Sequence, residues 1–393
     1  MFYIWRMVLF IISILSYKFF TYDPSFPYAN VILNDFGLSQ WLFSWGSFDG
    51  VHYITIIDRG YESAALIQAF FPAFPMIVRF LNLVINNTLI SGLLVSNLSF
   101  LLFLFIWYLF IEKRYSSKLA SLSTLIILLF PSSLFFGAIY NESLFLLSVI
   151  LSFWFAESKK YFLAVIFIAL ASATRIVGIF LIPAILIEIV FEDYNFQNLF
   201  SSMFNKNKKE LKKLSTKFKK NLSSINKKLK PIGIISLGSL GLISYMLFLY
   251  LKFGDPLYFF HVQSEFGGTR QESLVSYPRV VYRYIKILLT ARPFNLIYFS
   301  SVKELVVGVF GLATILLSFK KVKFSYFIFA LIAFILPTLT GTFSSMSRYI
   351  LVSFPIFIVL AGWVERSKFF RYTWFIFSGI LLILNTMLFI QGH

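Results

Sequence analysis

The sequence predicts an all-α polytopic membrane protein, and three observations support this prediction. Of the 393 residues, 59% are hydrophobic and 13% are charged, a composition too apolar for a solvated globular surface. Apolar runs of roughly 20 residues, the length that crosses a hydrocarbon core, recur from Phe2–Phe20 to Trp374–Ile390. Short basic segments separate these runs. We therefore expect one integral membrane domain that covers residues 1–393.

The basic segments predict the topology of the chain. Five of them hold 22 of the 35 lysine and arginine residues: Glu112–Lys118, Glu157–Lys160, Glu192–Lys230, Lys320–Lys323 and Glu365–Arg371. By the positive-inside rule they face the cytoplasm. The third, residues 192–230, has eleven lysines and one acid within Lys206–Lys230. We interpret it as a solvated cytoplasmic loop that can touch anionic lipid headgroups, and not as a nucleic-acid surface.

Two crossings between neighbouring basic segments give about eleven transmembrane helices. We expect them near residues 5–21, 89–111, 119–133, 141–156, 161–172, 176–191, 231–252, 301–318, 324–341, 348–364 and 372–390, and the short fifth and sixth spans leave the count between ten and twelve. The outer segments are then 22–88, 131–140, 173–175, 253–300 and 341–347. Met7–Phe20 lacks a small-residue cleavage site and is interpreted as a retained first span.

Residue types that are absent or isolated exclude several chemistries. The chain has no cysteine, so thiolate metal sites, disulfides and thiol nucleophiles are excluded. The three histidines have no paired spacing, and no D-x-D acid pair, P-loop or dinucleotide fingerprint occurs. We therefore expect no metal, no cofactor and no cytosolic nucleotide-sugar mechanism.

The first outer segment, 22–88, contains the strongest candidate for acid–base chemistry. A helix over residues 48–57 places Asp49, His52, Tyr53 and Ile56 on one face. Asp49 is then a candidate general base, with His52 as an orienting or substrate-contacting neighbour. The alternative is an interfacial helix with a solvated polar face. The following aromatic and proline cluster, Phe70–Pro75, is typical of a helix that lies in the membrane interface.

A second candidate cluster lies where the third and fourth predicted spans meet. Tyr140, Asn141 and Glu142 lie where an outer segment meets the next span. Asn141 can cap that helix, with Glu142 favoured by the positive end of the helix dipole. A structural capping role and a functional role are equally good interpretations of these residues. Arg175, among small residues, needs an anionic partner. That partner is either the Glu142 carboxylate or the phosphate of a lipid-linked substrate.

The two remaining candidate regions are polar turns in the last outer segments. Gly254-Asp255-Pro256 is typical of a turn, and His261 and Gln263 come shortly after it. The second region, Ser344–Tyr349, places Arg348 at the outer edge of a span. Judged alone, each is more typical of a loop that joins two spans.

Taken together, these motifs resemble the PIG-V family of GPI mannosyltransferases and its prokaryotic relatives. The matching stretches are Phe48–Tyr61, Phe70–Pro75, Tyr140–Ser143, Ala171–Gly178, Gly254–Gln263 and Ser345–Pro355. The resemblance implies a GT-C fold with a catalytic acid in the first outer loop, here Asp49. It also implies inverting transfer of mannose from a polyprenyl-phosphate-mannose donor to a lipid-linked or glycan acceptor on the non-cytoplasmic face. Phe48 departs from the family, which usually has tryptophan before the acid.

The resemblance suggests a role for each candidate residue. Asp49 deprotonates the acceptor hydroxyl, and Arg175 and Arg348 stabilise the departing phosphate. The residues that contact sugar or acceptor are then His52, Tyr53, Arg59, Tyr140, Glu142, His261 and Gln263. A transporter or flippase is the competing interpretation, but such folds usually show internal repeats and sites at the membrane midplane. A non-catalytic subunit of a larger synthase is a third.

Overall fold

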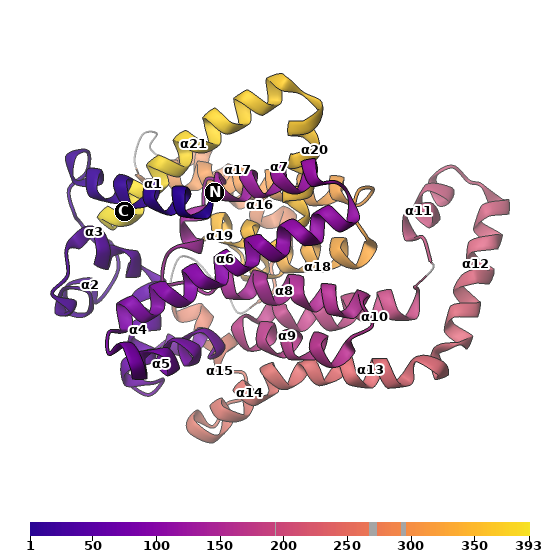
Figure 1. Ribbon diagram of the computed structural model, residues 1–393, viewed down its shortest axis with the longest axis horizontal. Helices are drawn as coiled ribbons and strands as arrows, with labels where there is room; N and C mark the ends of the chain where they lie inside the picture. Colours follow the sequence, from indigo (N-terminus) through magenta and orange to yellow (C-terminus); the bar gives the residue numbers. More distant parts are fainter. Residues whose placement is uncertain (193, 267–272, 292–295) are drawn as a thin grey trace.

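The computed structural model describes residues 1–192, 194–266, 273–291 and 296–393 (Figure 1). Within these residues every regular element is an α- or 3-10 helix, which confirms the predicted all-helical class. Most helices pack side by side as a bundle: α1 (Phe2–Leu15), α6 (Thr88–Arg114), α7 (Ser117–Leu128), α8 (Glu142–Glu157), α9 (Tyr161–Thr174), α10 (Leu181–Val190), α13 (Leu229–Ser236), α14 (Leu240–Phe253), α17 (Leu296–Ser318), α18 (Phe324–Ile335), α19 (Met346–Val352), α20 (Pro355–Arg366) and α21 (Lys368–Gln391). Residues 267–272 and 292–295 of the predicted outer segment 253–300 lie outside the described residues.

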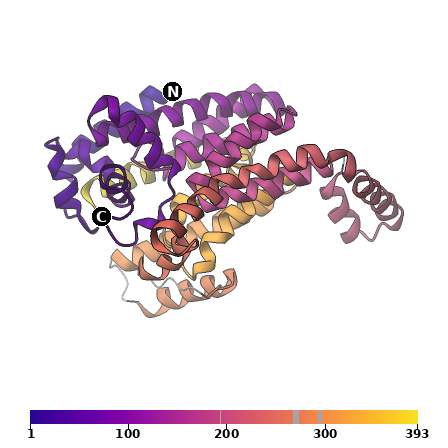
Figure 2. The same cartoon turned by 90° about the horizontal axis from the view of Figure 1, so that it is seen from below.

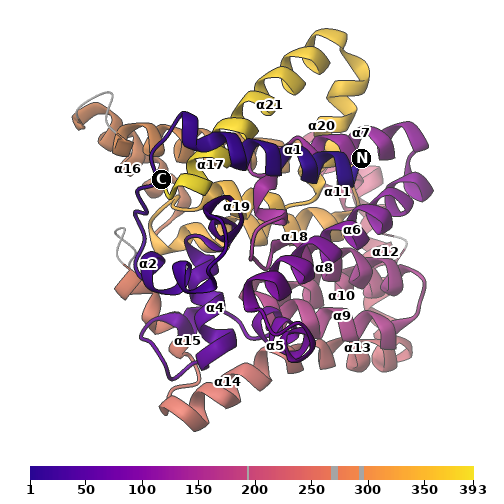
Figure 3. The same ribbon diagram turned by 60° about the vertical axis from the view of Figure 1, so that its left-hand side comes forward.

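Further helices cover the two ends of the bundle. At one end lie α2 (Ala29–Ile32), α3 (Gln40–Phe43), α4 (Asp49–Arg59) and α5 (Ala73–Ile85). Helix α15 (Tyr258–His261) packs beside the short Ile67–Ala69 turn before α5, and α16 (Tyr277–Thr290) packs on α17. At the other end α11 (Phe196–Phe204) and α12 (Lys208–Ser223) project beyond the bundle, as Figures 1 and 2 both show. Figure 3 shows α1 lying beside α21, so the first and last helices are neighbours.

The expected count of eleven membrane spans is not confirmed. Among the described residues four helical stretches are long and apolar enough to cross a membrane: Thr88–Arg114, Ile225–Phe253, Tyr298–Ser318 and Lys368–Gln391. A fifth is added if α19 and α20, which meet at a bend of 84°, form one span. Other predicted spans are shorter helices such as α7, whose 12 residues rise only about 18 Å of the roughly 30 Å that a hydrocarbon core requires. The chain is an integral membrane protein by its apolar helices.

Ion pairs join the predicted basic segments to one another, so these segments lie together at one end of the bundle. The pairs are Arg114–Glu157, Lys118–Glu365, Lys159–Glu192 and Lys323–Glu157. All five basic segments contribute to this set. Their common location agrees with a shared membrane face, and which face that is stays a prediction.

The lysine-rich segment 192–230 contains two helices and is not only a solvated loop. In α12 the apolar residues Leu211, Leu214 and Phe218 recur at helical spacing, so the helix has one apolar stripe. Leu214 is buried, and the ring of Phe218 stacks on that of Phe191 at 4.8 Å between centroids. This stripe therefore docks the helix, and the lysines remain exposed.

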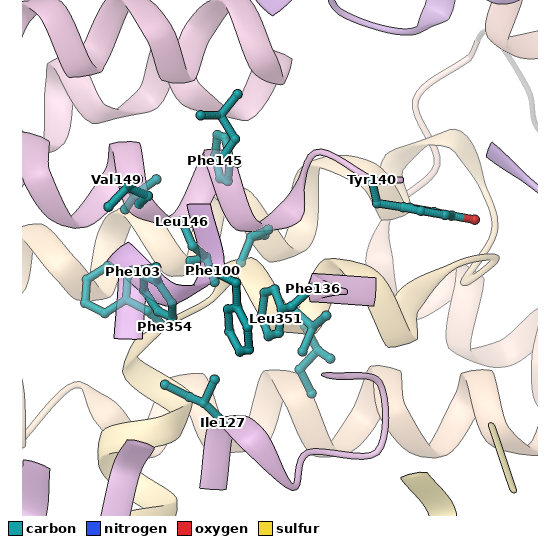
Figure 4. Packing of buried hydrophobic residues seen from close by; sticks show 14 of the residues in the cluster. Phe100, Phe103, Ile127, Phe136, Tyr140, Phe145, Leu146, Val149, Leu351 and Phe354 are labelled. Atoms are coloured by element: carbon teal, nitrogen blue, oxygen red, sulfur yellow. The ribbon is translucent and has the colours of Figure 1, made fainter. Parts of the chain in front are cut away.

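Stacked aromatic rings fill the centre of the bundle (Figure 4). The rings of Phe100 on α6 and Phe136 are 4.5 Å apart at 12°, and both side chains are fully buried. Helices in a membrane associate largely through such close van der Waals packing. Tyr140 leaves this cluster, since Figure 4 shows its hydroxyl pointing away from the other labelled side chains. The packed core thus fixes the backbone from which Tyr140 reaches the candidate site.

Candidate active site

Asp49 is the first residue of α4, which confirms the predicted helix in the first outer segment. An acid in the first turn is stabilised by the positive end of the helix dipole. The residue before it, Phe48, has a φ of 55°, a conformation that costs an aromatic residue energy. Its ring is held by Phe26 and Phe389, at centroid distances of 4.6 and 5.6 Å. The aromatic position before the acid therefore fixes the turn into α4 and does not line the site's cavity.

An ion-pair network joins Asp49 to three distant segments. Arg348, on α19, pairs through Nη1 with Asp49 and donates through Nε to Glu142 Oε1 at 2.9 Å. Arg175 donates to the same Glu142 oxygen at 3.0 Å. Glu142 is fully buried, and each arginine side chain is only 11% exposed. Of the two alternatives for the Arg175 partner, the structure shows the Glu142 carboxylate.

Hydrogen bonds of the Tyr140 hydroxyl hold the backbone at Asp49 in place. Its hydroxyl accepts a hydrogen bond from the Asp49 backbone N–H at 3.2 Å and donates one to the Ser47 carbonyl at 3.1 Å. The Arg348 guanidinium lies over the Tyr140 ring, 4.5 Å from its centroid, in the geometry of a cation–π interaction. One buried phenol therefore positions both members of the Asp49–Arg348 pair.

The network borders a cavity of about 270 Å³. Its lining includes the charged side chains of Asp49, Arg175 and Arg348. It also includes many apolar side chains: Ile176, Val177, Phe259, Phe260, Leu274, Ala333, Leu336, Pro337, Leu339 and Val352. A ligand with an anionic group joined to an apolar chain matches this mixed lining.

The structure brings some predicted site residues to the cavity and leaves others away from it. Asp49, Tyr53, Arg175, Gln263 and Arg348 line it, and Tyr140 and Glu142 lie directly behind the lining residues as their hydrogen-bond partners.

Arg59, His52 and His261 are not among the cavity-lining residues. Arg59 is exposed at the last turn of α4. The half-buried His52 ring packs against Phe70, with 5.1 Å between centroids. The exposed His261 pairs with Asp255 at 2.6 Å, and its hydrogen bond lowers the pKa of the Asp255 carboxyl.

Burial lowers the pKa of His52. Desolvation disfavours the imidazolium, and the Asp49 charge only partly offsets this effect. A neutral His52 is thus favoured beside the Asp49–Arg348 pair.

Asn141 is a site residue whose role the sequence did not reveal. Its side chain makes no capping bond to α8. Instead its Nδ2 donates to the Thr174 carbonyl at 3.0 Å, and its Oδ1 accepts from Arg175 at 3.3 Å. The predicted capping role of this side chain is therefore wrong, because Arg175 and the end of α9 offer better partners. Its position next to Glu142 was the available signal.

Phe70 and Phe71 also line the cavity, just before the amphipathic α5. The sequence interpretation placed this cluster just before an amphipathic stretch typical of an interfacial helix, and α5 begins after the two rings, at Ala73. Among the described residues no group of three or more His, Asp or Glu side chains could hold a metal ion.

Comparison with known families identifies the chain. The family model for mannosyltransferase (PIG-V) matches residues 6–226, more than half of the sequence. The chain belongs to the PIG-V mannosyltransferase family. It is accordingly a membrane glycosyltransferase, as the motifs predicted. The matched region includes Asp49, Tyr140, Glu142 and Arg175, whereas Arg348 lies beyond it.

Solved structures give this PIG-V family member distant neighbours. The oligosaccharyltransferase of Archaeoglobus fulgidus in its apo form matches with a TM-score of 0.42 and 12% identity, over 99% of this chain and 55% of that one. The same archaeal enzyme, AglB, in complex with an inhibitory peptide and a dolichol-phosphate, gives 0.43 and 13%, over 98% and 56%. The PIG-V chain thus spans about half the length of that enzyme. No curated protein matches its sequence.

Proposed function

We propose that the chain is an inverting mannosyltransferase that takes mannose from a polyprenyl-phosphate-mannose donor. The acceptor is a lipid-linked or glycan hydroxyl, and the reaction occurs on the non-cytoplasmic face. Family membership supports mannose transfer. The observation that most supports the mechanism is the pairing of Asp49 with Arg348, both of which line the cavity. The gathering of the basic segments at the other end of the bundle supports the choice of face.

The cavity's mixed lining suggests how such a donor binds. The donor has one phosphate and a long apolar chain, which match the arginines and the apolar side chains of the lining respectively. Arg175 and Arg348 provide guanidinium groups suited to phosphate oxygens. Tyr53 and Gln263, which line the same cavity, are placed to contact the sugar or the acceptor.

The reaction is a single displacement at the anomeric carbon. Asp49 accepts the proton of the acceptor hydroxyl as that oxygen bonds to the anomeric carbon. The bond from the anomeric carbon to the phosphate oxygen breaks, and polyprenyl phosphate leaves with the electron pair. The arginines stabilise the negative charge that develops on the leaving phosphate.

The pairing of Asp49 with Arg348 has a consequence for the mechanism. A carboxylate that is held by a guanidinium is a weak base. The donor phosphate competes for Arg348, and a shift of the guanidinium toward the phosphate frees Asp49 for proton transfer. Glu142 remains as the fixed anchor for both arginines.

Transfer of radiolabelled mannose from polyprenyl-phosphate-mannose tests the proposal. The purified chain in lipid nanodiscs is supplied with a panel of lipid and glycan acceptors. Asp49→Asn is expected to lower the rate about 10²–10⁴-fold, the usual value of a general base, with unchanged thermal unfolding. Asp35→Asn, at an exposed acid that does not line the cavity, is the matched control and keeps the native rate.

Two results would contradict the proposal in different ways. Full activity of Asp49→Asn excludes Asp49 as the base. Transfer of another hexose but not of mannose by the native chain overturns the donor sugar. Uptake of the intact donor lipid without transfer would favour a flippase instead.

A further inference from the structure

A groove at the basic end of the bundle, far from the candidate active site, combines lysines with apolar side chains. It has a volume of about 400 Å³ and lies between the start of α9 and the start of α13. Its lining is Lys159, Lys160, Tyr161, Phe162, Leu163, Lys230, Pro231 and Ile234. The other end of α9, a helix of 14 residues, reaches the cavity at Thr174, so roughly 20 Å separates the two sites.

The charge of this groove is unbalanced. Lys159 pairs with Glu192 at 2.8 Å. Lys160 and Lys230 are exposed, and no ion pair of theirs is found within the described part of the chain. The groove contains no acidic lining residue. Two lysine charges are therefore available to an anion.

Lys159, at the edge of the groove, has an uncommon backbone conformation. Lys159 has a φ of 59°, in the left-handed region that glycine usually occupies. The turn between α8 and α9 thus keeps a lysine where glycine would be less strained. Helix α9 begins at the groove without a side-chain cap, so the positive end of its helix dipole adds to the lysine charges.

The rest of the groove is apolar and continues onto the lipid-facing surface. Phe162 is 67% exposed, and Leu163 is 40% exposed. Further along, Ile166 on α9 and Leu237, directly after α13, are 58% and 50% exposed. An acyl chain can therefore extend from the groove along α9 and α13, a path that a soluble anion such as free phosphate would not use.

We propose that this groove binds one anionic phospholipid of the leaflet at the basic end of the bundle. Lys160 and Lys230 hold the phosphate, and an acyl chain lies along Phe162 and Ile234. Basic pockets between membrane helices bind anionic headgroups in this manner. The site is separate from the proposed transfer reaction and would exist whether or not that proposal holds.

Native mass spectrometry of the purified full-length chain tests the proposal. The chain is titrated with phosphatidylglycerol and, separately, with phosphatidylcholine. We expect one retained phosphatidylglycerol and no retained phosphatidylcholine. The double variant Lys160→Gln/Lys230→Gln is expected to bind phosphatidylglycerol at least about tenfold more weakly. The control Lys212→Gln/Lys213→Gln removes the same charge from the exposed face of α12 and keeps the native affinity.

Three outcomes overturn the proposal. Equal retention of the two lipids shows that the groove does not discriminate between lipids by the charge of their headgroups. Equal loss in the control variant assigns the binding to general surface charge. Complete displacement of phosphatidylglycerol by millimolar inorganic phosphate identifies a soluble-anion site.

A fluorescence measurement covers the case in which the double variant does not fold. Since the chain has no cysteine, Ile234→Cys provides a single labelling site within the groove. A bimane label there, in nanodiscs, is expected to be quenched more strongly by spin-labelled phosphatidylglycerol than by spin-labelled phosphatidylcholine. Equal quenching by both lipids contradicts the proposal independently of the lysine variants.

Discussion

Arg348 pairs with Asp49 although 299 positions separate them in the sequence. The same guanidinium reaches Glu142, which also holds Arg175. Two acids and two arginines therefore form one network of balanced charge, beside a cavity that also has apolar lining residues. A phosphate group that enters this cavity competes with the two carboxylates for the arginines. This relation between pairing and binding is the basis of the first prediction.

Arg348→Lys is expected to lower kcat/KM for mannose transfer by roughly 10–100-fold. Arginine donates from Nε and Nη1 to two carboxylates at once, whereas one compact ammonium cannot span both positions with a fixed geometry. Steady-state transfer assays measure the change. Arg366→Lys, at an exposed arginine of the basic end, is the control and keeps the native value. An unchanged kcat/KM in Arg348→Lys would show that charge alone suffices.

Tyr140→Phe tests the support behind Asp49. The variant keeps the ring under Arg348 but loses the hydroxyl that accepts from the Asp49 N–H and donates to the Ser47 carbonyl. We expect a stability loss of about 1 kcal/mol, the net value of an ordinary hydrogen bond, and a lower kcat with little change in KM. Thermal unfolding and transfer assays are compared with Tyr108→Phe, whose exposed hydroxyl donates to Glu112. Equal effects in the two variants would argue against a positioning role.

The sequence predicted which residues belong to the site better than it predicted the contacts between them. The helical spacing around Asp49 placed that acid correctly at the start of α4, because local periodicity determines local structure. The pairing of Arg348 with Asp49 and Glu142 depends on helix packing over long sequence separations, which no local pattern encodes. His261 shows the same limit, since its neighbour Gln263 lines the cavity while His261 turns toward Asp255.

The number of membrane spans was harder to predict for a related reason. Hydropathy identifies apolar runs, but it does not reveal where a run bends or ends. The sharp bend between α19 and α20 divides one predicted span, and Pro355 begins the second helix. Proline at a helix start is visible in the sequence, whereas the bend that brings Arg348 to the cavity depends on tertiary packing.

His52 is expected to make stability depend on pH. Burial lowers its pKa from the usual 6.5, so the folded chain disfavours the protonated ring. Above pH 6.5 the imidazole is neutral in both states and no stability is lost. As pH falls below 6.5 the unfolded chain takes up a proton that folded His52 resists, and stability decreases until the pH passes the folded pKa.

The comparison of native chain and His52→Gln isolates this effect. Thermal unfolding is measured in the same detergent between pH 7.5 and pH 5. Glutamine does not titrate. The melting temperature of the variant is therefore expected to fall less between pH 7.5 and pH 5 than that of the native chain. Parallel curves for the two proteins would show that His52 does not contribute to the pH dependence.

Gly241→Ala is expected to disturb the packing of α14 against α9. A Cβ at position 241 would lie 1.9 Å from the Ala169 carbonyl oxygen and 2.4 Å from the Ser172 hydroxyl. A backbone oxygen cannot yield as a flexible side chain would, so the helices must separate. Overpacking of this kind costs roughly 1–3 kcal/mol. Because α9 ends next to Arg175, we also expect weaker donor binding, seen as a raised KM.

Gly379→Ala provides the matched control for this prediction. Gly379 also lies inside a long helix, α21, but a Cβ there meets nothing within 4 Å. Alanine in a helix interior is favoured over glycine by about 1 kcal/mol, so this variant is expected to unfold at a slightly higher temperature than the native chain. Opposite shifts for the two substitutions would attribute the loss at Gly241 to the close contact of the helices. Stabilisation by both would mean that α9 and α14 can separate without cost, and the KM of Gly241→Ala should then equal that of the native chain.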